Sequence, residues 1–119
     1  MKTQNVVLEK SLDFALPIIE FCEILEEKRK YVIAHQLLKS GTSIGANIHE
    51  AQNPSSNNDF INKIKIAAKE SEETKYWLYL CEHSKTNPFE DHLKTKIEEI
   101  CLILYKILST SIKNKNQNS

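Results

Sequence analysis

Hydrophobic residues recur along most of this chain at steps of three and four, the spacing that places side chains on one face of an α-helix. The rhythm breaks at the charged run 26–30, at the Asn, Pro and Ser cluster 53–58, and at residues 86–88. Proline disfavours helical geometry in the residue before it, and Ser and Asn side chains favour turns and helix starts. The pattern therefore predicts four helices joined by short connections.

The first helical segment, residues 6–27, carries two neighbouring apolar stripes. The first stripe consists of Leu8, Leu12, Ala15, Ile19 and Cys22. The second stripe consists of Phe14, Ile18, Phe21 and Leu25. Together they make an apolar face wider than one partner helix can cover, so we expect this helix to contact more than one neighbour.

The second segment, residues 31–52, combines an apolar seam with a polar one. The apolar seam consists of Ile33, Leu37, Gly41, Ile44, Ile48 and Ala51, and the adjoining polar seam of Gln36, Ser40, Ser43, Asn47 and Glu50. Polar groups beside a core must find hydrogen-bond partners. We expect Ser43, Asn47 and Glu50 to tie this helix to a neighbour, and recognition of a ligand is the alternative.

Two glycines, Gly41 and Gly45, lie one turn apart inside this second segment. Each weakens an isolated helix by about 1 kcal/mol relative to Ala. Close approach of another helix would offset that loss, because glycine has no side chain to hold a neighbour away. We therefore expect close helix packing at these positions, and a ligand-binding bend is the alternative.

The third segment begins near Ser56, where Ser56 and Asp59 have the spacing of a helix-capping pair. Its core positions follow a strict rhythm of four and three: Phe60, Ile64, Ala67, Ser71, Thr74, Leu78 and Cys81. A second stripe contains Ile66, Trp77 and Leu80. Tryptophan is enriched at binding hot spots, so this stripe is a candidate protein interface. The alternative is that Trp77 covers the edge of its own bundle.

The fourth segment is predicted to begin with Asn87 as its N-cap and Pro88 as its first residue, with acidic Glu90 and Asp91 near the positive helix end. Its core positions are Phe89, Leu93, Ile97, Ile100, Leu104, Ile107 and Ser111. Residues 113–119 lack an apolar anchor and are expected to form a flexible tail. Four helices with short connections predict an all-α, antiparallel up-and-down four-helix bundle.

The 119 residues suffice for one domain, which we expect to span the whole chain. With only two glycines, the chain lacks the clustered glycines of dinucleotide and Walker-type phosphate sites. It shows neither a signal-peptide pattern nor an apolar run of about 20 residues, the length that crosses a bilayer. We therefore expect a cytoplasmic protein without a membrane partner.

The residues that most often carry chemistry are scattered. Cys22, Cys81 and Cys101 lack the Cys-x-x-Cys spacing and fall in hydrophobic periodic segments, so buried free thiols are expected. No histidine completes the Glu-x-x-His motif that builds di-iron sites in helical bundles. The sequence therefore predicts a protein that is not an enzyme and has no metal or other cofactor.

Sixteen basic and sixteen acidic side chains give a formal net charge of zero, and a nucleic-acid role would have to rest on local patches. The candidate nucleic-acid contacts are Lys28, Arg29 and Lys30 at one helix junction, with Lys65 and Lys69 on one face of the third segment. Interspersed glutamates favour an ordinary solvated surface instead.

The second segment also carries a recognisable motif. Residues 43–51 read Ser-Ile-Gly-Ala-Asn-Ile-His-Glu-Ala, and a polar break with Asp59-Phe60 follows. This resembles the four-helix-bundle family encoded in intervening sequences of bacterial 23S rRNA genes, which typically shows Ser-Ile-Pro-Ala-Asn-Ile-Ala-Glu-Gly. The chain departs from that motif at Gly45, His49 and Ala51. The resemblance spans roughly residues 11–109.

That resemblance implies a left-handed up-and-down bundle that assembles into a homopentamer, without established catalytic residues. The related accessory proteins of diversity-generating retroelements form similar pentamers that engage a reverse transcriptase and nucleic acid. The leading hypothesis is therefore a non-enzymatic, self-associating bundle subunit. The alternative is an RNA- or DNA-binding protein or a reverse-transcriptase accessory scaffold.

Overall fold

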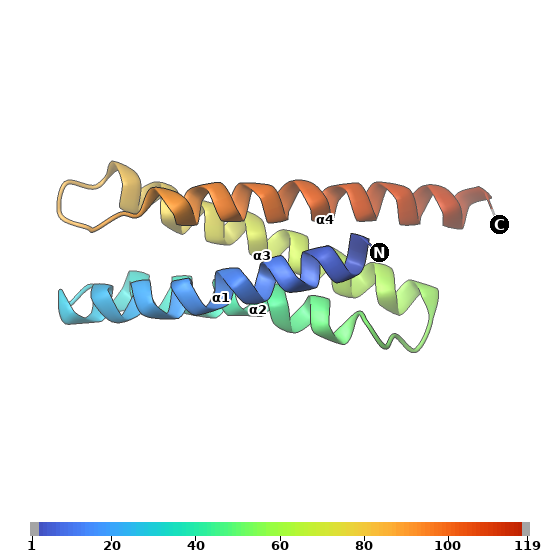
Figure 1. Ribbon diagram of the computed structural model, residues 1–119, viewed down its shortest axis with the longest axis horizontal. Coiled ribbons are helices and arrows are strands. Elements are labelled where there is room, and N and C mark those ends of the chain that lie inside the picture. The colour runs from blue at the N-terminus through green and yellow to red at the C-terminus, as the bar shows by residue number, and fades with distance from the viewer. Residues whose placement is uncertain (1–2, 118–119) are drawn as a thin grey trace.

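Four long helices make up nearly all of the protein in the computed structural model, which describes residues 3–117 (Figure 1). They are α1 (Thr3–Glu27), α2 (Tyr31–Glu50), α3 (Asn57–His83) and α4 (Asp91–Gln117). Consecutive helices run in opposite directions, each packs against the next, and α1 packs against α4. The predicted all-α up-and-down four-helix bundle is confirmed, and its left-handed sense stays a prediction.

The bundle is 52 Å long and 24 by 22 Å across. The α1–α2 turn and the α3–α4 connection lie at the same end of the bundle (Figure 1). The α2–α3 loop lies at the opposite end, together with the start of α1 and the end of α4. Residues from the start of α2 and the end of α3 therefore meet at one pole of the molecule.

The core runs the length of the bundle and contains most of the positions that the sequence pattern predicts for α2, α3 and α4. Its largest fully buried side chains are Phe14, Phe21, Ile18, Leu25, Leu37, Ile44, Ile48, Ile64, Leu78, Leu93, Ile97 and Ile100. Phe60 and Phe89 pack against the core from partly buried positions near the ends of the bundle. Periodicity alone therefore located three of the four inward faces.

The inward face of α1 is narrower than the predicted one. The stripe that includes Phe14 and Ile18 is fully buried, whereas the other predicted stripe is divided: Cys22 is buried, but Leu12 and Ile19 are 55% and 38% exposed. Leu16, between them on the same side of the helix, is 68% exposed. Both stripes are apolar, so the rhythm could not decide which one faces the core. We call Leu12, Leu16 and Ile19 the α1 outer stripe.

The contact with α2 decides the rotation of α1. A methyl group added at Gly41 would lie 2.9 Å from Ile18 Cγ2, and one added at Gly45 would lie 3.3 Å from Ser11 Oγ. Ile18 and Ser11 are buried side chains of α1. The close helix packing predicted at both glycines is therefore observed, and it turns Ile18 inward.

Ser56 and Asp59 form the capping interaction predicted for the third helix. Ser56 Oγ accepts a hydrogen bond of 3.0 Å from the Asp59 backbone N–H, and α3 begins at the next residue, Asn57. Asp59 Oδ2 accepts a bond of 3.0 Å from the Ser55 backbone N–H. The two bonds satisfy backbone donors that the helix itself leaves free.

The predicted start of the fourth helix is wrong. α4 begins at Asp91, so Asn87 is not its N-cap and Pro88 is not its first residue. Residues 88–90 instead form an irregular connection that lets Phe89 pack against the core. At the other end, residues 113–117 of the predicted flexible tail are helical, and the rest of that tail lies outside the described residues.

The unequal contacts of the two glycines predict unequal effects of alanine. In Gly41→Ala the new methyl group meets the stiff, β-branched Ile18, and we expect a net loss of about 1 kcal/mol of unfolding free energy despite the gain in helix propensity. In the matched variant Gly45→Ala the contact with Ser11 Oγ is longer, 3.3 Å, and the gain in helix propensity offsets the small shift that it requires, so we expect stability near that of the wild type. Urea unfolding at fixed protein concentration measures both. Equal stabilities would contradict this account.

Candidate interaction surface

The predicted polar seam of α2 faces α3. Glu50 forms an ion pair of 2.8 Å with Lys63 of α3. Burial raises the pKa of the Glu70 carboxyl on α3, while a side-chain hydrogen bond with Ser43 lowers it. Asn47 is half-buried and donates through Nδ2 to the Ser43 carbonyl oxygen at 2.9 Å. The contacts of Ser43 and Glu50 with α3 favour the structural interpretation for those two residues, whereas the hydrogen bond of Asn47 stays within α2.

A buried hydroxyl pair lies deeper in the same helix contact. Thr74 of α3 and Ser40 of α2 are almost completely buried, and their Oγ atoms lie 2.9 Å apart. Thr74 Oγ1 also lies 2.8 Å from the Glu70 carbonyl oxygen. Burying a hydroxyl without a partner costs free energy, so this pair favours one register between α2 and α3.

The three predicted interface residues do not form one patch. Trp77 and Leu80 are half-buried near the end of α3 and line a common groove. Ile66 is exposed and lies eleven residues before Trp77, or about 16 Å along the helix. Trp77 Nε1 donates to Glu73 Oε2 at 3.1 Å, and the Trp77 ring meets Tyr76 edge-on with centroids 5.1 Å apart. These contacts fix the orientation of the Trp77 indole against residues of its own helix, α3.

The groove beside Trp77 is an open hollow of about 690 Å³ at the pole where α2 begins and α3 ends. We call it the basic groove, because Arg29 and Lys30 line it and no carboxylate does. Two carboxylates contact lining residues from outside the groove: Glu82 Oε1 lies 3.7 Å from His83 Nε2, and Glu73 accepts from Trp77 Nε1. The lining consists of Arg29, Lys30, Tyr31, Val32, Ile33, Trp77, Leu80, His83, Ser84, Thr86 and Asn87. The floor is largely apolar, so the groove suits a partner that combines apolar surface with negative charge.

Sequence reasoning missed the apolar side of this groove. Tyr31 and Val32 are 60% and 77% exposed, although they open an amphipathic helix. The signal was present in the run 31–33, which places three hydrophobic residues in succession directly after three cations. A helix buries only part of such a run, so the remainder faces solvent.

Arg29 holds an unusual backbone conformation at the rim of the groove. Its φ of 62° is the only positive φ of a non-glycine residue in the part of the chain that the structure describes. The Lys30 N–H bonds to the Leu25 carbonyl at 2.8 Å, and the Arg29 N–H bonds to that of Glu26 at 2.9 Å. This is the Schellman arrangement that ends many helices, usually with glycine in the left-handed position. Arginine there costs roughly 1–2 kcal/mol.

The candidate nucleic-acid contacts are divided between two regions. Arg29 and Lys30 line the basic groove, whereas Lys28 is exposed but does not line it. Lys65 and Lys69 are exposed on α3. Lys69 precedes Trp77, the first α3 residue that lines the groove, by eight residues, which is about 12 Å of helix, so the α3 lysines lie outside the groove. The five cations do not form one continuous patch.

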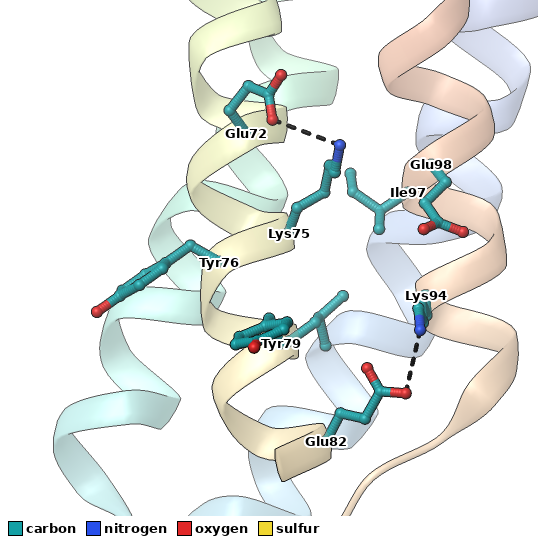
Figure 2. Close-up of a pocket in the computed structure, with 9 residues that line it drawn as sticks. Glu72, Lys75, Tyr76, Tyr79, Glu82, Lys94, Ile97 and Glu98 are labelled. Carbon is teal, nitrogen blue, oxygen red and sulfur yellow. Dashed lines mark hydrogen bonds and ion pairs between the residues drawn. The ribbon is translucent and has the colours of Figure 1, made fainter.

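A second hollow, of about 310 Å³, lies between α3 and α4 (Figure 2). Its two lysines are paired: Lys94 Nζ lies 3.1 Å from Glu82 Oε2, and Lys75 Nζ lies 3.5 Å from Glu72 Oε1. Figure 2 shows both pairs at the walls of the hollow. A third carboxylate, Glu98, also lines the hollow, so its lining carries one more carboxylate than lysines.

The cysteines are buried free thiols, as expected. Burial raises the pKa of Cys22 to about 12 and that of Cys81 to about 11, and it also raises the pKa of Cys101. These thiols stay protonated near neutral pH, and a protonated thiol is a poor nucleophile. Across residues 3–117, no group of three or more His, Cys, Asp or Glu side chains is placed to hold a metal ion. None of the described helices is long and apolar enough to span a membrane.

These features define an all-α four-helix bundle with a tied α2–α3 contact and a basic, apolar groove at one pole. The chain belongs to the 23S rRNA-intervening sequence protein family, whose sequence pattern matches residues 3–106. The resemblance found in residues 43–51 is therefore confirmed.

A solved structure agrees with this assignment. The chain is similar to a protein of unknown function from the S23 ribosomal protein family of Bacteroides thetaiotaomicron VPI-5482, with 41% sequence identity and a TM-score of 0.84. The similarity covers 91% of this chain and 99% of the other. A comparison with curated proteins finds no match.

The strained backbone at Arg29 gives a prediction that separates conformation from charge. Arg29→Gly and Arg29→Ala both remove the guanidinium, but only glycine relieves the positive φ of 62°. We expect Arg29→Gly to unfold with about 1 kcal/mol more free energy than Arg29→Ala. Urea unfolding of the two variants side by side measures the difference. An alanine variant as stable as the glycine variant would show that this backbone position carries no strain.

Proposed function

We propose that this protein is a non-enzymatic bundle subunit that self-associates, and that its assembly is a pentamer. The observation that carries the proposal is the α1 outer stripe, in which Leu12, Leu16 and Ile19 remain uncovered by the chain's own helices. Burying one leucine side chain stabilises a complex by about 1.5–3 kcal/mol relative to leaving it in water. A second copy that covers this stripe gains several such contributions.

The predicted interface residues extend the proposed contact surface. Ile66 is exposed on α3, and Trp77 and Leu80 offer a half-buried apolar rim near the pole. Aromatic side chains at a partly desolvated site favour protein association. Three free thiols fit a reducing compartment, which supports a cytoplasmic location in a bacterial cell. The protonated thiols support the absence of an enzymatic role.

The mass of the protein in solution gives its oligomeric state. Light scattering coupled to gel filtration at micromolar concentration is expected to give a multiple of the 13.7 kDa subunit mass, five for a pentamer. Leu16→Glu adds a charge to the exposed stripe without touching the core, so we expect it to shift the protein towards the subunit mass.

Leu102→Glu is the matched control for that variant. Leu102 is a comparably exposed leucine on α4, at 74%, so the same substitution there tests whether any added charge dissociates the assembly. We expect Leu102→Glu to retain the wild-type mass. A wild-type protein that is strictly monomeric at micromolar concentration contradicts self-association.

A second candidate function is binding of RNA or DNA, either directly or as a reverse-transcriptase accessory scaffold. The supporting observation is the basic groove, where Arg29 and Lys30 lie beside Tyr31 and Trp77. Aromatic rings can stack on unpaired bases, and cations can contact phosphates. The neutral overall charge and the distance of Lys65 and Lys69 from the groove make this the weaker of the two functions.

Salt dependence tests the nucleic-acid candidate. With about three phosphate contacts on a single strand, raising the salt from 50 to 200 mM is expected to weaken binding about 20-fold. Fluorescence anisotropy with a labelled single-stranded RNA measures this, and Lys106→Glu, at an exposed position of α4, serves as the control. No binding at the lower salt concentration would reject the candidate.

A further inference from the structure

Two uncovered surfaces of this chain carry opposite charges. α1 contains six carboxylates and one cation, Lys10, which forms an ion pair of 3.0 Å with Glu99 of α4. Glu20 and Glu23 follow Leu16 and Ile19 by four residues each, so they lie beside the α1 outer stripe on the same side of the helix. Both are exposed, and neither is ion-paired to another residue in the part of the chain that the structure describes. The stripe is therefore apolar and acidic.

The basic groove has the complementary character. Arg29 and Lys30 stand at its rim, no carboxylate lines it, and Val32 is 77% exposed on its apolar part. A partner that binds in this groove has to cover aliphatic side chains and also carry negative charge. An amphipathic helix with an acidic border meets both requirements, whereas a phosphate backbone offers charge without a matching apolar surface.

We propose that the α1 outer stripe of one copy of this chain docks into the basic groove of the next copy, with Glu20 and Glu23 facing Arg29 and Lys30. The proposal rests on the proposed self-association and names the two surfaces that make it. Both surfaces belong to one chain, and the interface they form is heterologous, so each copy binds one neighbour through its stripe and another through its groove. Such contacts build rings when the rotation between copies closes.

The two surfaces do not pair within one copy. Leu16 precedes Glu27, the last residue of α1, by eleven residues, or about 16 Å of helix, and Glu23, the acidic residue of the stripe nearest to the groove, precedes Arg29 by six residues. The groove lies beyond that end, at the pole where α1 turns into α2. Among the ion pairs of the described residues, neither Glu20 nor Glu23 is joined to Arg29 or Lys30, so the acidic stripe remains available to another molecule.

The conformation of Arg29 supports a role for its charge. Glycine is the residue that this backbone position favours, yet the chain places its only arginine there. Strained backbone conformations cluster at functional sites, where the role of the side chain outweighs the cost of the strain. A guanidinium held at the rim of the groove can form two parallel hydrogen bonds with a partner carboxylate.

Charge reversal tests the pairing directly. Arg29→Glu with Lys30→Glu reverses the groove, and Glu20→Lys with Glu23→Lys reverses the stripe. Each pair of substitutions is expected to weaken association about 100-fold, measured by light scattering over a dilution series. The chain that carries all four substitutions has both surfaces reversed, and it is expected to recover the wild-type mass. Lys106→Glu with Lys115→Glu, on exposed positions of α4, controls for the change in net charge.

Each outcome decides a different question. A monomeric wild-type protein rejects self-association itself. An assembled wild-type protein whose mass survives both reversals keeps self-association and overturns this pairing, as does a fourfold variant that stays dissociated while circular dichroism shows a folded bundle. A groove reversal that leaves the mass unchanged and abolishes binding of single-stranded RNA overturns the pairing in favour of a nucleic-acid site.

Discussion

The contact between α1 and the bare backbone of α2 determines most of what this bundle presents to its surroundings. Ile18 lies so close to Gly41 that even a methyl group there would meet its Cγ2 atom at 2.9 Å. This contact fixes the rotation of α1 about its axis. One apolar stripe is then buried in the core, while Leu12, Leu16 and Ile19 on another side of the helix remain exposed, because a helix has only one inward face. The exposed hydrophobic surface of α1 is therefore a consequence of the same packing that stabilises the fold.

The sequence predicted the architecture well where each helix has a single apolar stripe. In α2, α3 and α4 the core rhythm identified Leu37, Ile64 and Leu104, which are all fully buried. The prediction failed in α1, which has two apolar stripes. Which of them faces the core depends on the glycines of α2, and the spacing of residues within α1 does not show this. The prediction also placed the start of α4 too early, because local cap preferences of Asn87 and Pro88 gave way to the packing of Phe89 against the core.

The candidate surfaces were harder to predict than the core. The polar seam was recognised because its spacing runs beside an apolar seam, but its partners Lys63 and Glu70 depend on the register between two helices. The basic groove joins the α1–α2 turn to the end of α3, which lie about fifty residues apart in the chain. Periodicity treats one helix at a time, so it cannot show that Arg29 and Trp77 line the same hollow.

The burial of all three cysteines has a practical consequence for studying this molecule. Thiols that are both inaccessible and protonated near neutral pH do not compete for maleimide reagents. A cysteine introduced at an exposed position such as Ser109 would therefore be the one sulfur that takes a label. Fluorescent dyes at that single site would allow energy transfer between copies to be recorded without first removing native residues from the core.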